Sequence, residues 1–205
     1  MRILDNHDPY YLTFDHKNTD EIIRISQNFV EWDLLNLEYW GSNKKFINKK
    51  LDPWPSKCLV NLVPNAKELQ LLESRVSLFI SAPGLWYQPH KDGYNVRHKF
   101  GINYPISIRD DRCITNWYSD DICEGKEIDT IGGKSTEVTN FDPALHTPLC
   151  STIFKPGKPA LFNTDIFHNW DNSQSSNMRI MLTFRSDNEN INFKKAKEIL
   201  FGTLQ

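Results

Sequence analysis

The sequence predicts a mainly β protein of the sandwich or barrel type with flanking helices (α+β). The chain has 205 residues, of which 39% are hydrophobic and 24% charged, close to the average of globular domains. From Val76 onward, short runs rich in β-branched and aromatic residues alternate with turn residues. A helical pattern is found near each end of the chain. We expect one domain, with a helical N-terminal support (1–75), a β core (76–186) and a C-terminal helix (187–205).

The N-terminal segment carries two helix signals. Apolar residues recur on one helical face behind Asp20 and Glu21, whose charges suit the first turn, and predict a helix over about 20–32. A polar connection rich in Lys and Asn follows. Asn65 and Glu68 then have the spacing of an N-cap and its capping-box partner, so a second, short helix is expected there.

The β core is predicted from six runs with strand composition. They are VSLFIS, FGINYPISI, ITNWY, STIF, PALFN and MRIMLTFR. Residues 119–148 have little periodicity and are expected to form a long surface loop, with a lid over a site as the alternative. The pattern NFKKAKEILFG predicts a last helix that packs on the sheet.

Charge and targeting signals narrow the partners. Lys plus Arg number 24 and Asp plus Glu 26, so a net charge of −2 gives no global field for nucleic acid or anionic lipid. No stretch has the length of a membrane span, and Asp5 and Asp8 interrupt the region where a signal peptide needs an apolar core. The four cysteines form no CxxC pair and are expected to be reduced. We expect a cytoplasmic protein with a small-molecule or peptide substrate.

The most informative motif is H-x-D, in the segment PGLWYQPHKDGYN. His90 and Asp92 stand two residues apart just after an apolar run. In an extended chain, alternation places both side chains on one face, where imidazole and carboxylate can converge on one metal ion. The alternative is an exposed turn around Asp92 and Gly93.

A second segment supplies a third possible ligand. In KPGKPALFNTDIFHNWDN, a Pro/Gly turn leads into a strand that runs towards His168. Two histidines and one carboxylate on one side of a metal leave the opposite positions open, as in non-haem Fe(II) oxygenases. The alternative for His168 is a buried histidine with satisfied nitrogens. Asp165 lies on the opposite face of an extended strand and is therefore not expected to be the carboxylate ligand.

The third segment is a strand with one apolar face. Its apolar positions are Met178, Ile180, Leu182 and Phe184, and they alternate with Arg179, Met181, Thr183 and Arg185. If the apolar face packs against the N-terminal helices, Arg179 and Thr183 point into the barrel. A buried guanidinium needs an anion, which a small dicarboxylate chelated to the metal would supply. The alternative is an arginine that faces solvent.

The ordered set of these motifs resembles the 2-oxoglutarate and Fe(II)-dependent oxygenase superfamily, over residues 76–186. The resemblance implies a double-stranded β-helix, a jelly-roll or cupin-like core. It implies that His90, Asp92 and His168 are the catalytic iron ligands and that Arg179 binds the far carboxylate of 2-oxoglutarate. It also implies O2 as co-substrate, release of succinate and CO2 on hydroxylation, and ascorbate as a possible addition.

Further residues are candidates for co-substrate or substrate contact. Asn103 and Thr183 are candidates for the co-substrate, although alternation places only one of Asn103 and its neighbour Tyr104 towards the barrel. Trp86, Tyr94 and Arg97 flank the H-x-D motif and are candidates for the substrate, with plain packing as the alternative. The other four histidines are expected to be surface or structural groups: His7, His16, His98 and His146.

The subtype within the superfamily stays open. The run GINYPIS is similar to a core strand of some aspartyl/asparaginyl hydroxylase-like and viral or bacterial members. Prolyl 4-hydroxylases carry Lys where Arg179 stands and a GG-x-T-x-F strand, of which Gly132 and Gly133 are a faint echo, so a prolyl 4-hydroxylase-like enzyme is a minority interpretation. Asp92 argues against a halogenase. A non-catalytic jelly-roll binding module and a cupin-like metalloenzyme that needs no oxoacid remain as alternatives.

Overall fold

A computed structural model describes residues 1–35, 46–92, 98–107, 112–122, 125–130, 133–138, 141–142 and 145–202. The elements in chain order are β1 (Arg2–His7), β2 (Tyr11–Asp15), α1 (Thr19–Leu35), β3 (Phe46–Lys50), α2 (Pro53–Leu62), η2 (Glu73–Arg75), β4 (Ser77–Ser81), β5 (His90–Asp92), β6 (Phe100–Ser107), β7 (Ile114–Trp117), η3 (Asp120–Ile122), β8 (Gly125–Thr130), β9 (Gly133–Val138), β10 (Cys150–Thr152), β11 (Ala160–Asn163), β12 (His168–Asp171), β13 (Arg179–Arg185) and α3 (Phe193–Phe201).

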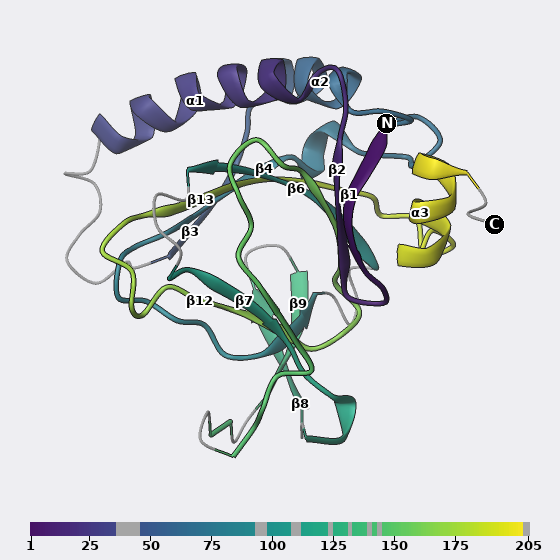
Figure 1. Ribbon diagram of the computed structural model, residues 1–205. Coiled ribbons are helices and arrows are strands. Elements are labelled where there is room, and N and C mark those ends of the chain that lie inside the picture. Colours follow the sequence, from purple (N-terminus) through teal and green to yellow (C-terminus); the bar gives the residue numbers. More distant parts are fainter. Residues whose placement is uncertain are drawn as a thin grey trace.

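Two antiparallel sheets face each other (Figure 1). The seven-stranded major sheet has the order β1-β2-β11-β6-β13-β4-β3, and the six-stranded minor sheet has the order β10-β7-β12-β5-β9-β8. Strands far apart in sequence are neighbours in both sheets: β13 pairs with β4 and β6 in the major sheet, and β12 pairs with β5 in the minor sheet. The mainly β class with a jelly-roll core is therefore confirmed.

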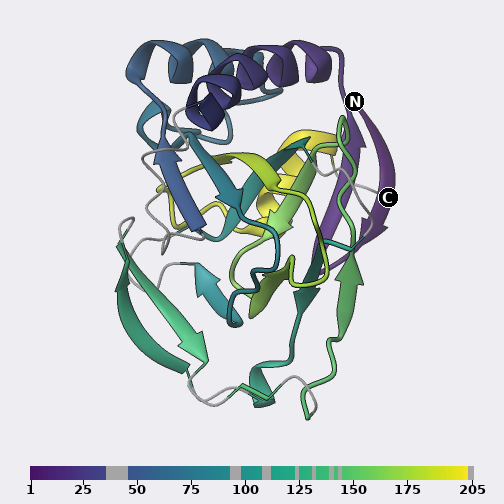
Figure 2. The ribbon, with the colours of Figure 1, turned by 90° about the vertical axis from the view of Figure 1, so that its left-hand side faces the viewer.

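The helices cover the outer face of the major sheet. Figure 2 shows α1 and α2 side by side along that face. Ile180, Leu182 and Phe184 of β13 are at most 2% exposed and belong to one apolar cluster with Ile22 of α1 and Leu59 of α2. Because side chains alternate along a strand, the other positions of β13, which include Arg179 and Arg185, point into the space between the sheets.

A second apolar cluster fills one end of the space between the sheets. Trp117 of β7 is fully buried and stacks on Tyr11 of β2, with ring centroids 5.1 Å apart. Phe162 of β11 lies against the same indole at 4.9 Å and also meets the His168 ring edge to face at 4.8 Å. The aromatic packing therefore reaches the edge of the predicted metal site and supports one of its ligands.

The two terminal helix predictions are confirmed. α1 begins at Thr19 with Asp20 and Glu21 in its first turn, and continues beyond the expected end. α3 is capped by Asn192, whose side chain accepts a hydrogen bond from the backbone N–H of Lys195. No helix within the described ranges has the length and apolarity needed to span a membrane.

The helix expected after Asn65 is wrong. The described chain forms turns there, and Asn65 and Gln70 both have a φ of 52°, which is incompatible with a continuing right-handed helix. The second helix lies earlier, at α2, where Pro53 occupies the first turn and needs no backbone donor. Leu69, which lies in this stretch, is buried from a turn at 0% exposed, whereas Leu72 is 36% exposed.

The prediction of a helical support over residues 1–75 is also wrong in part. β1 and β2 form one edge of the major sheet and β3 forms the other.

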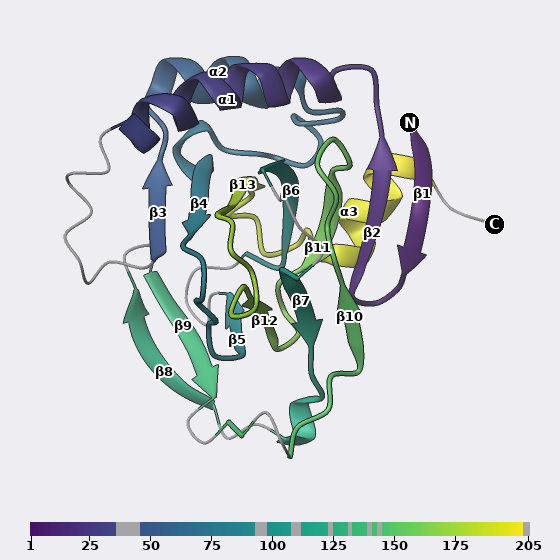
Figure 3. The same ribbon diagram turned by 60° about the vertical axis from the view of Figure 1, so that its left-hand side comes forward.

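The expected long loop over 119–148 contains η3 and the β8–β9 hairpin, which extends the minor sheet beyond β5 (Figure 3). The expected strand STIF is displaced, because β10 spans Cys150–Thr152. These segments join the two sheets through strands distant in sequence, because β2 pairs with β11, β3 with β4 and β9 with β5, and local composition does not reveal such partners.

Candidate metal centre

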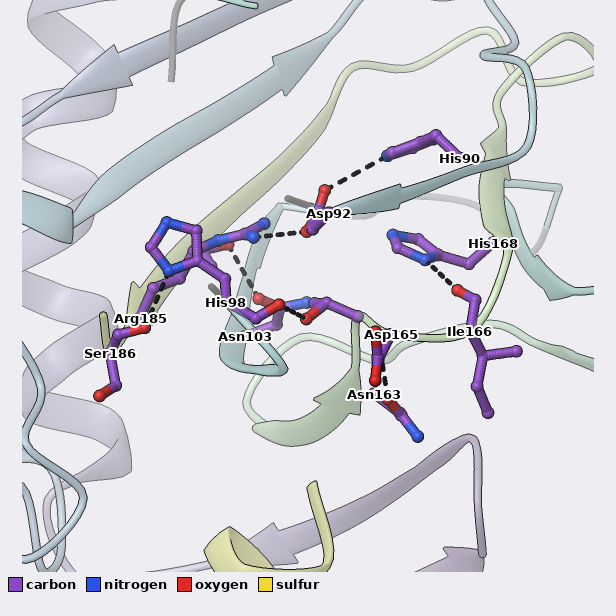
Figure 4. Close-up of polar contacts among 12 residues, drawn as sticks. His90, Asp92, His98, Asn103, Asn163, Asp165, Ile166, His168, Arg185 and Ser186 are labelled. Carbon is purple, nitrogen blue, oxygen red and sulfur yellow. Dashed lines mark hydrogen bonds and ion pairs between the residues drawn. The ribbon is translucent and has the colours of Figure 1, made fainter. Parts of the chain in front are cut away.

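Three side chains with metal-binding chemistry converge between the sheets. His90 and Asp92 belong to β5, and His168 begins β12, where it pairs directly with His90 in the antiparallel ladder. One nitrogen from each histidine and one oxygen of Asp92 all lie within 4.8 Å of one another. Figure 4 shows the three side chains pointing towards a common centre. His90 Nε2 is 3.6 Å from Asp92 Oδ1.

Backbone carbonyls fix how both imidazoles are turned. His90 Nδ1 lies 3.0 Å from the Gln88 carbonyl oxygen, and His168 Nδ1 lies 2.8 Å from that of Ile166. Because a carbonyl oxygen only accepts, both Nδ1 atoms carry the proton. Both Nε2 atoms are then left with a free lone pair, the arrangement that a metal ligand requires.

The charge states also suit a metal. Burial lowers the pKa of His168 to about 3, and the neighbouring His90 acts in the same direction, so this imidazole is neutral near pH 7. Burial alone raises the pKa of Asp92, but the Arg185 guanidinium and the two imidazoles outweigh it and hold this pKa well below its usual range. Two neutral nitrogens and one carboxylate fit a divalent cation of the iron type and fill only one side of its coordination sphere.

Arg179 is a buried cation in the same interior. It is 6% exposed, lies on the inward face of β13, and its Cζ is 6.0 Å from the ring centre of Trp170. Within the described part of the chain it has neither a hydrogen bond nor an ion pair. Burial lowers its pKa, yet a guanidinium stays protonated in proteins. Trp170 and His168 lie on the same face of β12, so Arg179, which is beside Trp170, lies in the same interior as the three-residue cluster. Its charge is therefore available to an anion bound there.

The other predicted residues fall into three groups. Thr183 donates a hydrogen bond to Asn103 Oδ1 at 2.8 Å, and both side chains face the interior, whereas Tyr104 is buried in the cluster under the helices. Trp86 is 39% exposed and lies 6.2 Å from Phe141, ring centre to ring centre. Tyr94 and Arg97 lie outside the described residues.

Asp165 and the histidines outside the two motifs were not expected to be metal ligands, and the structure places those that it describes outside the cluster. Asp165 is exposed and its backbone N–H donates to Asn163, outside the three-residue cluster. His98 is buried, with Nδ1 2.8 Å from the Ser186 carbonyl oxygen, and His16 is buried against the Tyr104 hydroxyl at 2.6 Å.

One functional group was not singled out from the sequence. Arg185 forms an ion pair with Asp92 (Figure 4). Its position, three steps of the two-residue alternation beyond Arg179, was visible in the strand pattern, because Arg179, Met181, Thr183 and Arg185 share one face. Nothing in the sequence indicated that β5 would lie within its reach.

The fold and site together define a double-stranded β-helix protein with a candidate metal centre inside the barrel. Among solved structures, the non-heme alpha-ketoglutarate-dependent carbocyclase SnoK from nogalamycin biosynthesis aligns with a TM-score of 0.52 at 8% identity, over 86% of this chain and 80% of its own. The non-heme monooxygenase ThoJ, in its apo form, aligns with a TM-score of 0.46 at 12% identity, over 84% of this chain and 70% of its own. The SnoK alignment, with a TM-score above 0.5, agrees with the double-stranded β-helix fold. No protein-family model and no curated protein matches the sequence.

Proposed function

We propose that this chain is a 2-oxoglutarate- and Fe(II)-dependent dioxygenase that hydroxylates a small-molecule or peptide substrate. The observation that carries the proposal is the combination of a two-histidine, one-carboxylate cluster with the uncompensated cation of Arg179 in one interior. A metal centre alone would be compatible with many activities. The added guanidinium provides a binding partner for a ligand that is anionic at the end remote from the metal.

Each residue has a defined task in this proposal. His90, Asp92 and His168 would hold Fe(II), with their orientation maintained by the backbone carbonyls described above. Arg179 would bind the far carboxylate of 2-oxoglutarate and so set the direction of the oxoacid. Fe(II) with 2-oxoglutarate supplies O2 activation and the oxidation of a C–H bond, with succinate and CO2 as the other products.

The barrel interior contributes to orientation and to exclusion of water. Phe162 packs on the His168 ring and Tyr87 on the edge of His90, with centroids 4.8 and 5.0 Å apart. These contacts restrict both imidazoles to one rotamer. Asn103 and Thr183 lie on the inward face of the major sheet, and we assign them to the co-substrate wall, with their mutual hydrogen bond limiting rotation of the amide.

The direct test is the addition of Fe(II) and 2-oxoglutarate to metal-free protein without oxygen. The proposal expects a visible charge-transfer band that is lost in His168→Ala, and succinate formation with ascorbate once O2 and a substrate are supplied. Candidate small molecules and peptides are then screened by mass spectrometry for a gain of one oxygen. Folded wild-type protein that binds the metal but gives no band with 2-oxoglutarate would favour the cupin-like alternative without an oxoacid.

A further inference from the structure

The two oxygens of the Asp92 carboxylate have different surroundings. Asp92 Oδ2 is ion-paired with a terminal nitrogen of Arg185, whereas Oδ1 is 3.6 Å from His90 Nε2. One oxygen is thus engaged by a cation and the other lies near the His90 imidazole. Both contacts are made by side chains of this chain, since Arg185 belongs to β13 and His90 to β5.

From this division we propose that Arg185 is a positioning residue that makes Asp92 a one-oxygen metal ligand. The inference rests on the proposed function, since it concerns the same metal centre. A cation with six coordination positions has three left after two imidazole nitrogens and one carboxylate oxygen. A chelating oxoacid takes two and leaves one position free. If Asp92 bound through both oxygens, the oxoacid would fill the sphere and leave no position for O2.

Arg185 is itself held in place. Its side chain is 16% exposed, and its Cζ lies 5.6 Å from the ring centre of Phe79 on the neighbouring strand β4. In the ladder it stands opposite Gly101 of β6, which has no side chain to compete for the space. The guanidinium therefore has little freedom to leave the carboxylate.

The backbone on both sides of the ion pair is also fixed. The backbone N–H of Asp92 donates to the Thr164 carbonyl oxygen at 3.0 Å. The carbonyl oxygen of Ser186, which follows Arg185, accepts a hydrogen bond from His98 Nδ1 at 2.8 Å. Because both backbones are anchored independently, the ion pair sets the rotation of the carboxylate and is not needed to bring the strands together.

The test measures binding of Co(II), a spectroscopic probe, to metal-free protein that carries Arg185→Met or Arg185→Lys. The proposal expects wild type to bind one Co(II). In Arg185→Met the affinity falls about 10- to 100-fold, as for loss of other groups that orient metal ligands, and the visible bands change because the carboxylate contributes a different number of oxygens. Arg185→Lys keeps the charge without the planar fork, so it retains more affinity but still has altered bands. Circular dichroism checks the fold of each variant. If Arg185→Met is unfolded, the Co(II) affinity and bands of Arg185→Lys test the proposal.

The matched control is Arg75→Met, because Arg75 forms an ion pair with Asp187, a carboxylate outside the three-residue cluster. Its Co(II) affinity and spectrum should equal those of wild type. Unchanged affinity and bands in folded Arg185 variants would overturn the role of Arg185 and leave the oxygenase proposal intact. Wild-type protein that binds no Co(II), or binding that survives His168→Ala, would instead overturn the metal centre itself.

Discussion

The Nδ1 atom of His168 lies 2.8 Å from the carbonyl oxygen of Ile166, two residues earlier in the chain. The same relation holds between His90 and Gln88 at 3.0 Å. Each of these two histidines is thus oriented by its own local backbone, whereas the meeting of the two strands is decided by the tertiary structure. This local fixation means that the nitrogens are turned to the site before any metal arrives.

Replacement of His90 by Ala should reduce affinity for a divalent metal by more than about 100-fold, because loss of a ligand is more severe than loss of a group that orients one. Isothermal titration of metal-free protein with Co(II) measures the change. His7→Ala is the control, since His7 is an exposed histidine on β1, outside the cluster. Equal binding by His90→Ala and wild type would exclude His90 as a ligand.

Replacement of Arg179 by Met should weaken binding of 2-oxoglutarate by about 10- to 100-fold, the effect of losing a charge-assisted hydrogen bond. Affinity for 2-oxopentanoate, which lacks the far carboxylate, should change little. Titration of the metal-loaded protein with both oxoacids separates the two effects. The exposed Arg24, which forms an ion pair with Glu21, provides the control Arg24→Met. A similar loss for both oxoacids would place Arg179 elsewhere than at the far carboxylate.

Stability should fall as the solution is acidified. Burial lowers the pKa of His16 from 6.5 to about 4, and burial likewise lowers that of His98 to about 4. Between these values the unfolded chain takes up protons that the folded chain does not. The free energy of unfolding therefore decreases as pH drops from about 6.5 towards 4, by up to about 1.4 kcal/mol per pH unit for each group.

Urea unfolding of metal-free protein at several pH values measures this slope. His16→Gln should flatten it, because glutamine does not titrate and can still hydrogen-bond the Tyr104 hydroxyl that His16 contacts. An equally steep slope in His16→Gln would show that its protonation is not linked to folding.

Replacement of Leu182 by Ala should lower the free energy of unfolding by about 2 to 5 kcal/mol. Leu182 is 0% exposed between β13 and the helices, so the truncation leaves a cavity under the strand that carries both arginines. Thermal or urea unfolding measures the loss. Leu72→Ala is the control, because Leu72 is 36% exposed and should change stability by less than about 1 kcal/mol. A loss for Leu182→Ala no larger than for Leu72→Ala would contradict this packing.

The parts of the site that follow from local pattern were predictable. The two-residue spacing of His90 and Asp92 and the alternation along β13 each depend only on extended geometry. The same alternation correctly directed the apolar positions of β13 to the helices. The partner of Arg185 was not predictable, because β5 and β13 belong to different sheets and no sequence spacing relates them.

The elements of the fold likewise divide into those that the local sequence predicts and those that depend on distant strands. Helices α1 and α3 were predictable because an amphipathic pattern and end signals lie within a dozen or so residues. The strands β1, β2 and β3 were missed, and a helix was expected after Asn65 where turns occur. Strand β1 pairs with the adjacent strand β2, whereas β2 also pairs with β11 and β3 pairs with β4. The place of this hairpin and of β3 in the major sheet therefore depends on partners farther along the chain.

The sequence by itself determined which chemical groups this chain has available and which face of each strand presents them, because side-chain direction repeats every two residues in an extended backbone. Only the tertiary structure decided that His168 pairs with His90 across the minor sheet, and that Asp92 meets a guanidinium from the opposite sheet. The physical reason is that convergence of distant strands depends on the packing of the whole barrel, whose contacts are spread over most of the chain.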